Sequence, residues 1–367
     1  MSVMKDRLIF DHNHYVPCLR WKQGEYQALS RLGHGTKEVI TPLIEVPEIG
    51  WDFETNEEAK TLDAHVEKFA KRVVEKWGER WAFVDLQLVS RDRMANGRHP
   101  VGYVFDDLAA RGAFAIPVTG VGRDGAYQAE VSKVVSRDRN GACVRATLQE
   151  VSSGQFPVAL VSLLRTLALR PNDAHFILDL ESPSFEPLEG FTKMVIKLMS
   201  KIPAINRWRT LTICGTSFPE TMGEVERGVE IRKRFEWLSY KLLCRTLAPV
   251  DRRPTFGDYA IAHPALLRVD MRRVKPAASL RYTIDDAWYI AKGRNLRDNG
   301  NEQYRDQCAN LISSGLFMGE RYSAGDEHIR KCAARLVDPG NLTTWRWVGT
   351  NHHLRKAVMD ISSLSAS

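Results

Sequence analysis

Three acidic residues each end a short apolar run, and this repeated placement is the clearest chemical signal in the sequence. Glu45 ends the run VITPLIE, Asp85 ends WAFVD and Asp179 ends HFILD. Carboxylate oxygens are the ligands that Mg²⁺ prefers, and a bound metal can activate water and neutralise the charge that develops in phosphodiester hydrolysis. The sequence therefore marks Glu45, Asp85 and Asp179 as candidate metal ligands and candidate catalytic residues.

Two basic residues lie near the ends of two further apolar runs. Lys22 follows YVPCLR, and Arg145 lies within ACVRATL. Beside the three acids, both side chains would bind phosphate oxygens, so both join the candidate catalytic set. Lys22 has a second interpretation, because a lysine in an apolar pocket loses its charge and becomes a Schiff-base nucleophile. The structural alternative for the whole set is that acids and bases pair with one another or cap the following helices.

A second set of residues, in the last third of the chain, mixes aromatic with basic side chains. Trp288, Arg294 and Arg346 combine stacking and charge in the way that binding of single-stranded nucleic acid requires. His352 and His353, in GTNHHL, are candidate hydrogen-bond donors to phosphate. The alternatives are structural: the aromatic rings pack in the core, and one histidine faces inward while its neighbour faces solvent. Neighbouring histidines point in different directions and rarely bind one metal.

The apolar runs themselves predict strands buried on both faces, the type found in parallel sheets. Amphipathic helical patterns, such as the one at Thr61–Gly78, fill nearly every gap between them. Eight βα units in roughly 250 residues favour a TIM-like (β/α)8 barrel, with site residues at the carboxyl ends of the strands. No GxGxxG or GxxxxGK[ST] follows a strand, which argues against a Rossmann or P-loop fold. The predicted strands are Tyr15–Arg20, Val39–Val46, Trp81–Leu86, Ala113–Thr119, Ala142–Leu148, His175–Ser182, Thr210–Thr216 and Asp258–His263.

The alternation stops after His263, which predicts two parts. Residues 13–265 form the α/β barrel, with a long helix over Ile231–Leu247 before the last strand. Residues 266–367 form an α+β extension packed on the barrel. In the extension, Ser279–Lys292 alternates like an antiparallel hairpin, and three helical patterns follow. This part carries 16 Lys/Arg against 11 Asp/Glu and is therefore basic.

Composition limits the class of protein. The 367 residues carry a net charge of +7, which suits a phosphate-bearing partner, although a solvated basic surface is the alternative. No apolar run approaches the roughly 20 residues that span a bilayer, and the N-terminus has no signal-peptide core. The six cysteines are scattered without a CxxC pair, as expected for buried free thiols in a reducing compartment. We therefore expect a cytoplasmic protein without a membrane partner.

Several motifs, spread over nearly the whole chain, resemble in their order the family called "beta protein", named after a bacteriophage T4 protein. The motifs are YVPCLRWKQGE, TPLIEVPE, RFEWLSYKLL, FGDYAIAHP, LRYTIDDAWYIAKGR, YSAGDEHI and GTNHHL. The resemblance implies a phage, mobile-element or antiviral-defence setting, in some members beside a nuclease-like protein partner. It implies no catalytic residues, because the family has no established activity.

Two functions remain open. The protein is either a recognition subunit that binds nucleic acid, a nucleotide or an effector partner, or a Mg²⁺-dependent phosphodiesterase or related hydrolase with its carboxylates at the barrel rim. The first is favoured, because no catalytic motif stands out and most of the charge excess lies outside the predicted barrel.

Overall fold

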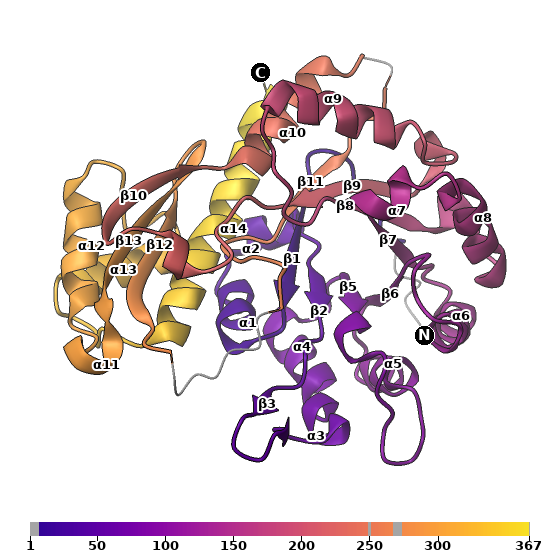
Figure 1. Cartoon of the computed structure of the whole chain (residues 1–367), viewed down its shortest axis with the longest axis horizontal. Helices are drawn as coiled ribbons and strands as arrows, with labels where there is room; N and C mark the ends of the chain where they lie inside the picture. The colour runs from indigo at the N-terminus through magenta and orange to yellow at the C-terminus, as the bar shows by residue number, and fades with distance from the viewer. Residues whose placement is uncertain (1–6, 249–250, 267–273, 367) are drawn as a thin grey trace.

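The computed structural model describes residues 7–248, 251–266 and 274–366. Eight parallel strands close into a barrel in the order β1-β11-β9-β8-β7-β6-β5-β2 (Figure 1). This arrangement confirms the predicted (β/α)8 fold. The barrel strands are β1 (Tyr15–Arg20), β2 (Leu43–Glu45), β5 (Ala82–Asp85), β6 (Ala115–Thr119), β7 (Cys143–Thr147), β8 (His175–Asp179), β9 (Thr210–Gly215) and β11 (Thr255–Asp258).

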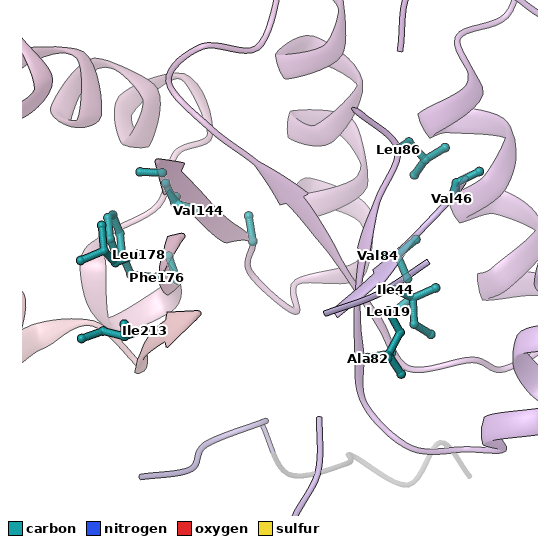
Figure 2. Close-up of a cluster of buried hydrophobic side chains, with 14 of the residues drawn as sticks. Leu19, Ile44, Val46, Ala82, Val84, Leu86, Val144, Phe176, Leu178 and Ile213 are labelled. Atoms are coloured by element: carbon teal, nitrogen blue, oxygen red, sulfur yellow. The ribbon is translucent and has the colours of Figure 1, made fainter. Parts of the chain in front are cut away.

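Helices surround the barrel, and each strand is buried on both faces, as continuous apolar runs require. On β8, Ile177 packs inside the barrel. Phe176 and Leu178 pack outward against the helical layer (Figure 2). All six cysteines are free and buried. The surrounding helices are α1 (Gln23–Ser30), α2 (His34–Glu38), α3 (Leu62–Val66), α4 (Phe69–Trp77), α5 (Pro100–Ala110), α6 (Gly125–Asp138), α7 (Leu148–Ser152), α8 (Phe156–Thr166), α9 (Leu188–Met199) and α10 (Phe235–Thr246).

The last barrel strand corrects the predicted one at Asp258–His263. β11 begins at Thr255 and ends at Asp258, because its pairing with β1 and β9 covers only these residues. The chain then turns: Asp258 Oδ1 accepts a hydrogen bond from Ala260 N–H (2.8 Å), and Ala260 adopts a left-handed φ of 53°. Residues 259–263 therefore form a loop at the rim instead of a strand.

A three-stranded antiparallel sheet lies beside the barrel, in the order β10-β13-β12 (Figure 1). The strands β12 (Ala277–Thr283) and β13 (Ala287–Asn295) form the expected hairpin. The third strand, β10 (Gly228–Lys233), corrects the helix predicted over Ile231–Leu247, since residues 231–233 pair with β13 and the helix begins at Phe235. The sheet thus takes one strand from within residues 13–265, and a boundary at residue 265 stays a prediction.

The C-terminal helices attach this sheet to the barrel. Helix α14 (Leu342–Ala366), yellow in Figure 1, runs between the sheet and the barrel and packs against α1, β1 and β12. A Cβ on Gly24 of α1 would lie 2.3 Å from the Arg346 side chain, so the two helices meet at a position that needs glycine. The remaining helices are α11 (Leu296–Asn299), α12 (Gln303–Ser313) and α13 (Ala324–Ala333). Among the described residues, no helix is both long enough and apolar enough to cross a bilayer.

Small elements complete the connections. A hairpin of β3 (Trp51–Asp52) and β4 (Glu57–Glu58) lies between β2 and α3. Four 3₁₀ turns are η1 (Gln87–Val89), η2 (Pro171–Asp173), η3 (Ile205–Arg207) and η4 (Met222–Glu224).

Candidate functional site

Strand register brings the acids to one rim of the barrel. Glu45 lies in register with both Arg20 and Asp85, and Asp179 lies in register with Thr147. Asp85, Asp179 and Asp258 share a local design, in which one carboxylate oxygen accepts the backbone N–H two residues further on. The backbone turn after each acid therefore fixes the orientation of the carboxylate, and its second oxygen points toward neighbouring side chains. The three donors are Gln87 (3.0 Å), Glu181 (2.9 Å) and Ala260 (2.8 Å).

Arg145 lies between the three predicted metal ligands. Its NH1 donates to Glu45 Oε1 (2.7 Å) and to Asp85 Oδ2 (3.0 Å), and its Nε donates to Asp179 Oδ2 (2.8 Å). Its NH2 donates to the Tyr259 hydroxyl at 2.9 Å. Because these contacts occupy every nitrogen of the guanidinium, Arg145 is committed to the protein and holds no nitrogen in reserve for a phosphate.

Further arginines balance the charge of the acids. Arg123 NH2 donates to Asp85 Oδ2 at 2.9 Å, and Arg20 lies 3.7 Å from Glu45. Burial alone raises the pKa of Asp85, but Arg123 and Arg145 outweigh it and hold that pKa below its ordinary value. Three carboxylates and three guanidinium groups thus form a buried, charge-balanced network, which we call the rim network.

The rim network differs in kind from a metal centre. Within the described ranges, no group of three or more His, Cys, Asp or Glu side chains is placed to hold a metal ion. Glu45, Asp85 and Asp179 do converge, but on a guanidinium. Lys22 lies outside this cluster: its Nζ contacts Glu48 Oε1 at 3.0 Å, and half of its side chain is exposed. An exposed, paired lysine lacks the apolar pocket that a Schiff-base nucleophile needs.

A cavity of about 220 Å³, which we call the mouth, opens at this rim. Its lining residues include Glu45, a member of the rim network, and Cys18 and Tyr259, which both contact Arg145. The Tyr259 hydroxyl donates to Asp179 Oδ2 at 2.7 Å, and burial together with Asp179 raises its pKa well above the ordinary value, so the phenol stays neutral. The other residues that line the mouth are Leu19, Arg20, Lys22, Glu25, Glu48, Glu220, Ala260, Ile261, Ala262, His263, Ala265, Arg346 and Thr350.

A larger cavity of about 630 Å³ adjoins the mouth and shares Lys22, Glu25 and Arg346 with it. This cavity, the basic groove, lies between the start of α1, the strand β12 and the start of α14. Most of its ionisable lining residues are basic. The remaining lining residues are Gln23, Gly24, Thr221, Met222, Gly223, Val274, Lys275, Pro276, Ala277, Ser279, Arg281, Lys292, Tyr304, Leu342, Thr343 and Trp345.

Two arginines in the basic groove share one acceptor. Arg281 NH1 and Arg346 NH1 both donate to the carbonyl oxygen of Ile261, at 3.3 and 3.0 Å. Arg346 also lies 3.6 Å from Glu25, whereas Nε of Arg281 is buried and has no hydrogen-bond partner among the described residues. Burial, with a smaller contribution from Arg346, lowers the pKa of Arg281 to about 9. The structure therefore holds two like charges together with incomplete compensation.

The predicted nucleic-acid-binding residues fall into different environments. Arg346 lines the basic groove, and Arg294 is exposed but is absent from the groove lining. Trp288 corrects the expectation of a stacking surface: it is fully buried and packs edge-on against Phe218, with ring centroids 5.0 Å apart. Phe218, Val225, Ile261 and Ile290 pack with the indole in one apolar cluster, so it has no free face for a base.

His352 and His353 are likewise buried and correct the expectation of phosphate donors. His352 contacts Asp326 Oδ2 at 2.8 Å and the carbonyl of Thr283 at 2.7 Å. His353 contacts Thr283 Oγ1 and Asp258 Oδ2, both at 2.8 Å. Both nitrogens of each ring are therefore used within the protein. Burial lowers the pKa of His353, although Asp258 acts in the opposite direction.

The sequence did not single out Arg281, Lys275, Lys292 or Tyr259. Arg281 and Lys292 do carry a signal, because each places a charge within an otherwise apolar, alternating hairpin. Such a charge needs a partner or a cavity. Tyr259 gave no signal of its own, since its strand was predicted three residues too late.

The chain was compared with protein families, curated proteins and solved structures. The model of the family described as "Beta protein" matches residues 15–359. No curated protein matches. Triosephosphate isomerase from Bartonella henselae is 13% identical, with a TM-score of 0.35 over 67% of this chain and 92% of that chain. A glycoside hydrolase family 5 enzyme from Prevotella bryantii is 10% identical, with a TM-score of 0.35 over 69% and 92%.

Proposed function

The chain belongs to the Beta protein family, and we propose that it is a recognition subunit that binds nucleic acid or a nucleotide through phosphate groups in the basic groove. One observation carries this proposal: Arg281 and Arg346 donate to the same carbonyl oxygen, and Nε of Arg281 has no partner among the described residues. Two guanidinium groups side by side repel each other. A phosphate between them would accept from both and remove that cost.

Three lysines extend the positive charge along the groove. Lys275 Nζ pairs with Asp298 at 3.1 Å, and Lys22 pairs with Glu48 at 3.0 Å. Among the residues that the structure describes, Lys292 Nζ donates to the backbone carbonyl of Val225, at 2.6 Å, and pairs with no acid. The Lys22–Glu48 and Lys275–Asp298 ion pairs are solvent-exposed, so each contributes little to stability. A phosphate can therefore replace the carboxylate in either pair at little cost. Successive phosphates of a strand would therefore find several cations in reach.

The rim network favours binding over hydrolysis. A metal-dependent phosphodiesterase needs carboxylate oxygens that are free to bind Mg²⁺, whereas Glu45, Asp85 and Asp179 are engaged by Arg145. In this proposal the protein supplies recognition in the cytoplasm, and a nuclease-like partner protein supplies any cleavage. The phage or defence setting is part of the same proposal.

Fluorescence anisotropy with labelled single-stranded DNA, single-stranded RNA and duplex DNA of equal length tests this proposal. At about 50 mM salt, where phosphate contacts are strong, the wild-type protein binds at least one probe. The double variant Arg281→Met/Arg346→Met keeps two long side chains but removes both guanidinium groups. Its affinity for the probe falls at least about tenfold, or roughly 1.4 kcal/mol.

The matched control is Arg330→Ala/Arg335→Ala, which removes two exposed charges of the same sign outside the groove. This control keeps wild-type affinity. If no probe binds at low salt, or if both double variants lose affinity equally, the groove is not a phosphate site.

A further inference from the structure

We infer that the ligand binds by its end: one terminal or free nucleotide spans both cavities, with its phosphate at the Arg281–Arg346 pair and its nucleoside in the mouth. This inference rests on the proposed function and narrows its ligand class. Because the mouth and the basic groove share Lys22, Glu25 and Arg346, a single ligand in contact with that shared wall can reach both.

The mouth suits a nucleoside and disfavours a phosphate. Four acids line it, Glu25, Glu45, Glu48 and Glu220, beside three bases, Arg20, Lys22 and Arg346. The mouth therefore offers both acceptors and donors, and it has no excess of positive charge that would attract a second phosphate. One of these acceptors is unused, because Oε2 of Glu48 is buried and has no hydrogen-bond partner among the described residues. Ribose hydroxyls and exocyclic amino groups of bases are donors that carboxylates accept. The two cavities therefore impose one orientation, with the phosphate in the groove and the sugar and base in the mouth.

The inner end of the mouth is closed, which favours the end of a strand over its interior. Glu45, Cys18 and Tyr259 line the mouth and contact Arg145, whose network fills the rim. Below the network, apolar side chains such as Phe83, Ile116 and Ile177 fill the barrel interior. The barrel is thus a packed core and not a pore. A strand cannot pass through it, and a terminal or free nucleotide enters the mouth without the backbone distortion that an internal nucleotide would need.

The decisive experiment compares linear and circular single-stranded oligonucleotides of the same sequence and length. Both have the same phosphate chemistry, but only the linear form has an end. We expect the linear form to bind at least about tenfold more tightly than the circular form. This difference corresponds to roughly 1.4 kcal/mol of binding free energy, which we assign to hydrogen bonds in the mouth. Adenosine, guanosine, cytidine and uridine 5′-monophosphates are then used as competitors, and at least one displaces the linear form more effectively than inorganic phosphate does.

The variant Glu48→Ala/Glu220→Ala assigns this preference to the mouth. Removal of two negative charges by itself strengthens the binding of a polyanion. We expect this variant instead to lose affinity for the linear form only, until the linear form binds no more tightly than the circular form. Such a loss is opposite in sign to the effect of the removed charges. The matched control, Glu38→Ala/Glu57→Ala, removes two exposed acids elsewhere on the barrel and keeps the tenfold preference.

The outcomes separate the two proposals. Equal binding of linear and circular forms overturns end recognition while leaving phosphate binding in the groove intact. A preference for the linear form that survives in Glu48→Ala/Glu220→Ala also overturns it, because the end is then recognised elsewhere. If neither form binds, the proposed function itself fails.

Discussion

Nε2 of His353 lies 2.8 Å from Oδ2 of Asp258, which joins α14 to the end of the barrel strand β11 across 95 residues of sequence. Asp258 Oδ1 also accepts from the Tyr15 hydroxyl at 2.5 Å, so the contact extends into β1. Arg346 lies seven residues before His353, two turns along the same face of α14. The His353–Asp258 contact therefore fixes the helix that carries one of the two groove arginines.

Replacement of His353 by Ala should destabilise the protein by about 3 kcal/mol. The variant leaves Oδ2 of Asp258 and the Thr283 hydroxyl buried without the ring nitrogens that they contact, and it opens a cavity. The free energy of unfolding, measured by urea titration, provides the test. His34→Ala is the control, because the His34 side chain is 81% exposed, and it should change stability by less than about 0.5 kcal/mol. A His353 variant as stable as this control would show that the contact does not hold α14 in place.

Stability should fall as the pH falls below about 6.5, the ordinary pKa of histidine. Burial lowers the pKa of His14 to about 4 and that of His175 well below the ordinary value. Between the folded and unfolded pKa values the unfolded state binds more protons, so protonation favours unfolding. For His14 alone the loss approaches about 3 kcal/mol at pH 4, at 1.36 kcal/mol for each pKa unit.

Urea titrations at pH 7.5, 6.5 and 5.5 measure this slope. His14→Gln, which keeps a hydrogen-bonding group near Thr41 but cannot be protonated, should reduce the slope by about one proton. Equal stability at pH 7.5 and 5.5 would mean that the buried histidines are protonated in the folded state as readily as in the unfolded state.

The barrel was predictable because its determinants are local. A run such as HFILD is apolar on both faces and ends in an acid, and the strand β8 covers His175–Asp179 accordingly. Where the prediction failed, tertiary pairing decided. GVEIRK alternates weakly and lies just before a helix, so only its pairing with β13, about 60 residues later, makes it a strand.

The position of the candidate site at the barrel rim was predictable, but the group that its acids bind was not. Parallel strands put their carboxyl ends at one rim, so the meeting of Glu45, Asp85 and Asp179 follows from topology. Whether such acids surround a metal ion or a guanidinium depends on the inward direction of Arg145, which no local pattern reveals. The groove depends on non-local geometry in the same way, because Arg281 and Arg346 meet only through the docking of α14 on β12.

Replacement of Arg145 by Ala should destabilise the protein, because Arg145 binds the carboxylates of the rim network. The variant leaves Glu45 and Asp179 without their main partner, and loss of one member of a buried ion pair costs about 3 to 5 kcal/mol. Arg145→Lys should recover only part of this, since a point charge cannot replace a fork of donors. The midpoint of thermal unfolding reports both effects.

Divalent metal should partly rescue Arg145→Ala but not the wild-type protein. Glu45 Oε1 and Asp85 Oδ2 both contact NH1 of Arg145, at 2.7 and 3.0 Å, so their oxygens face the position that the guanidinium would vacate. Carboxylates that converge on one position suit Mg²⁺ or Mn²⁺. An increase in Tm on addition of either metal is expected for the Ala variant only. If the Ala variant shows no increase, the acids do not converge closely enough to bind a cation.

The salt dependence of binding should count the phosphates in the basic groove. If Arg281 and Arg346 share one phosphate, and Lys275 and Lys292 each contact another phosphate of a single strand, the logarithm of affinity should fall with the logarithm of salt with a slope of about −2, at roughly −0.7 for each phosphate. Lys275→Ala/Lys292→Ala removes two of these contacts, so its slope should be shallower by about 1.4. Arg294→Ala, outside the groove lining, should leave the slope unchanged. Equal slopes for the wild type and the lysine variant would exclude Lys275 and Lys292 from the phosphate contacts, whereas a shallower slope in Arg294→Ala would extend the binding surface along β13 beyond the groove.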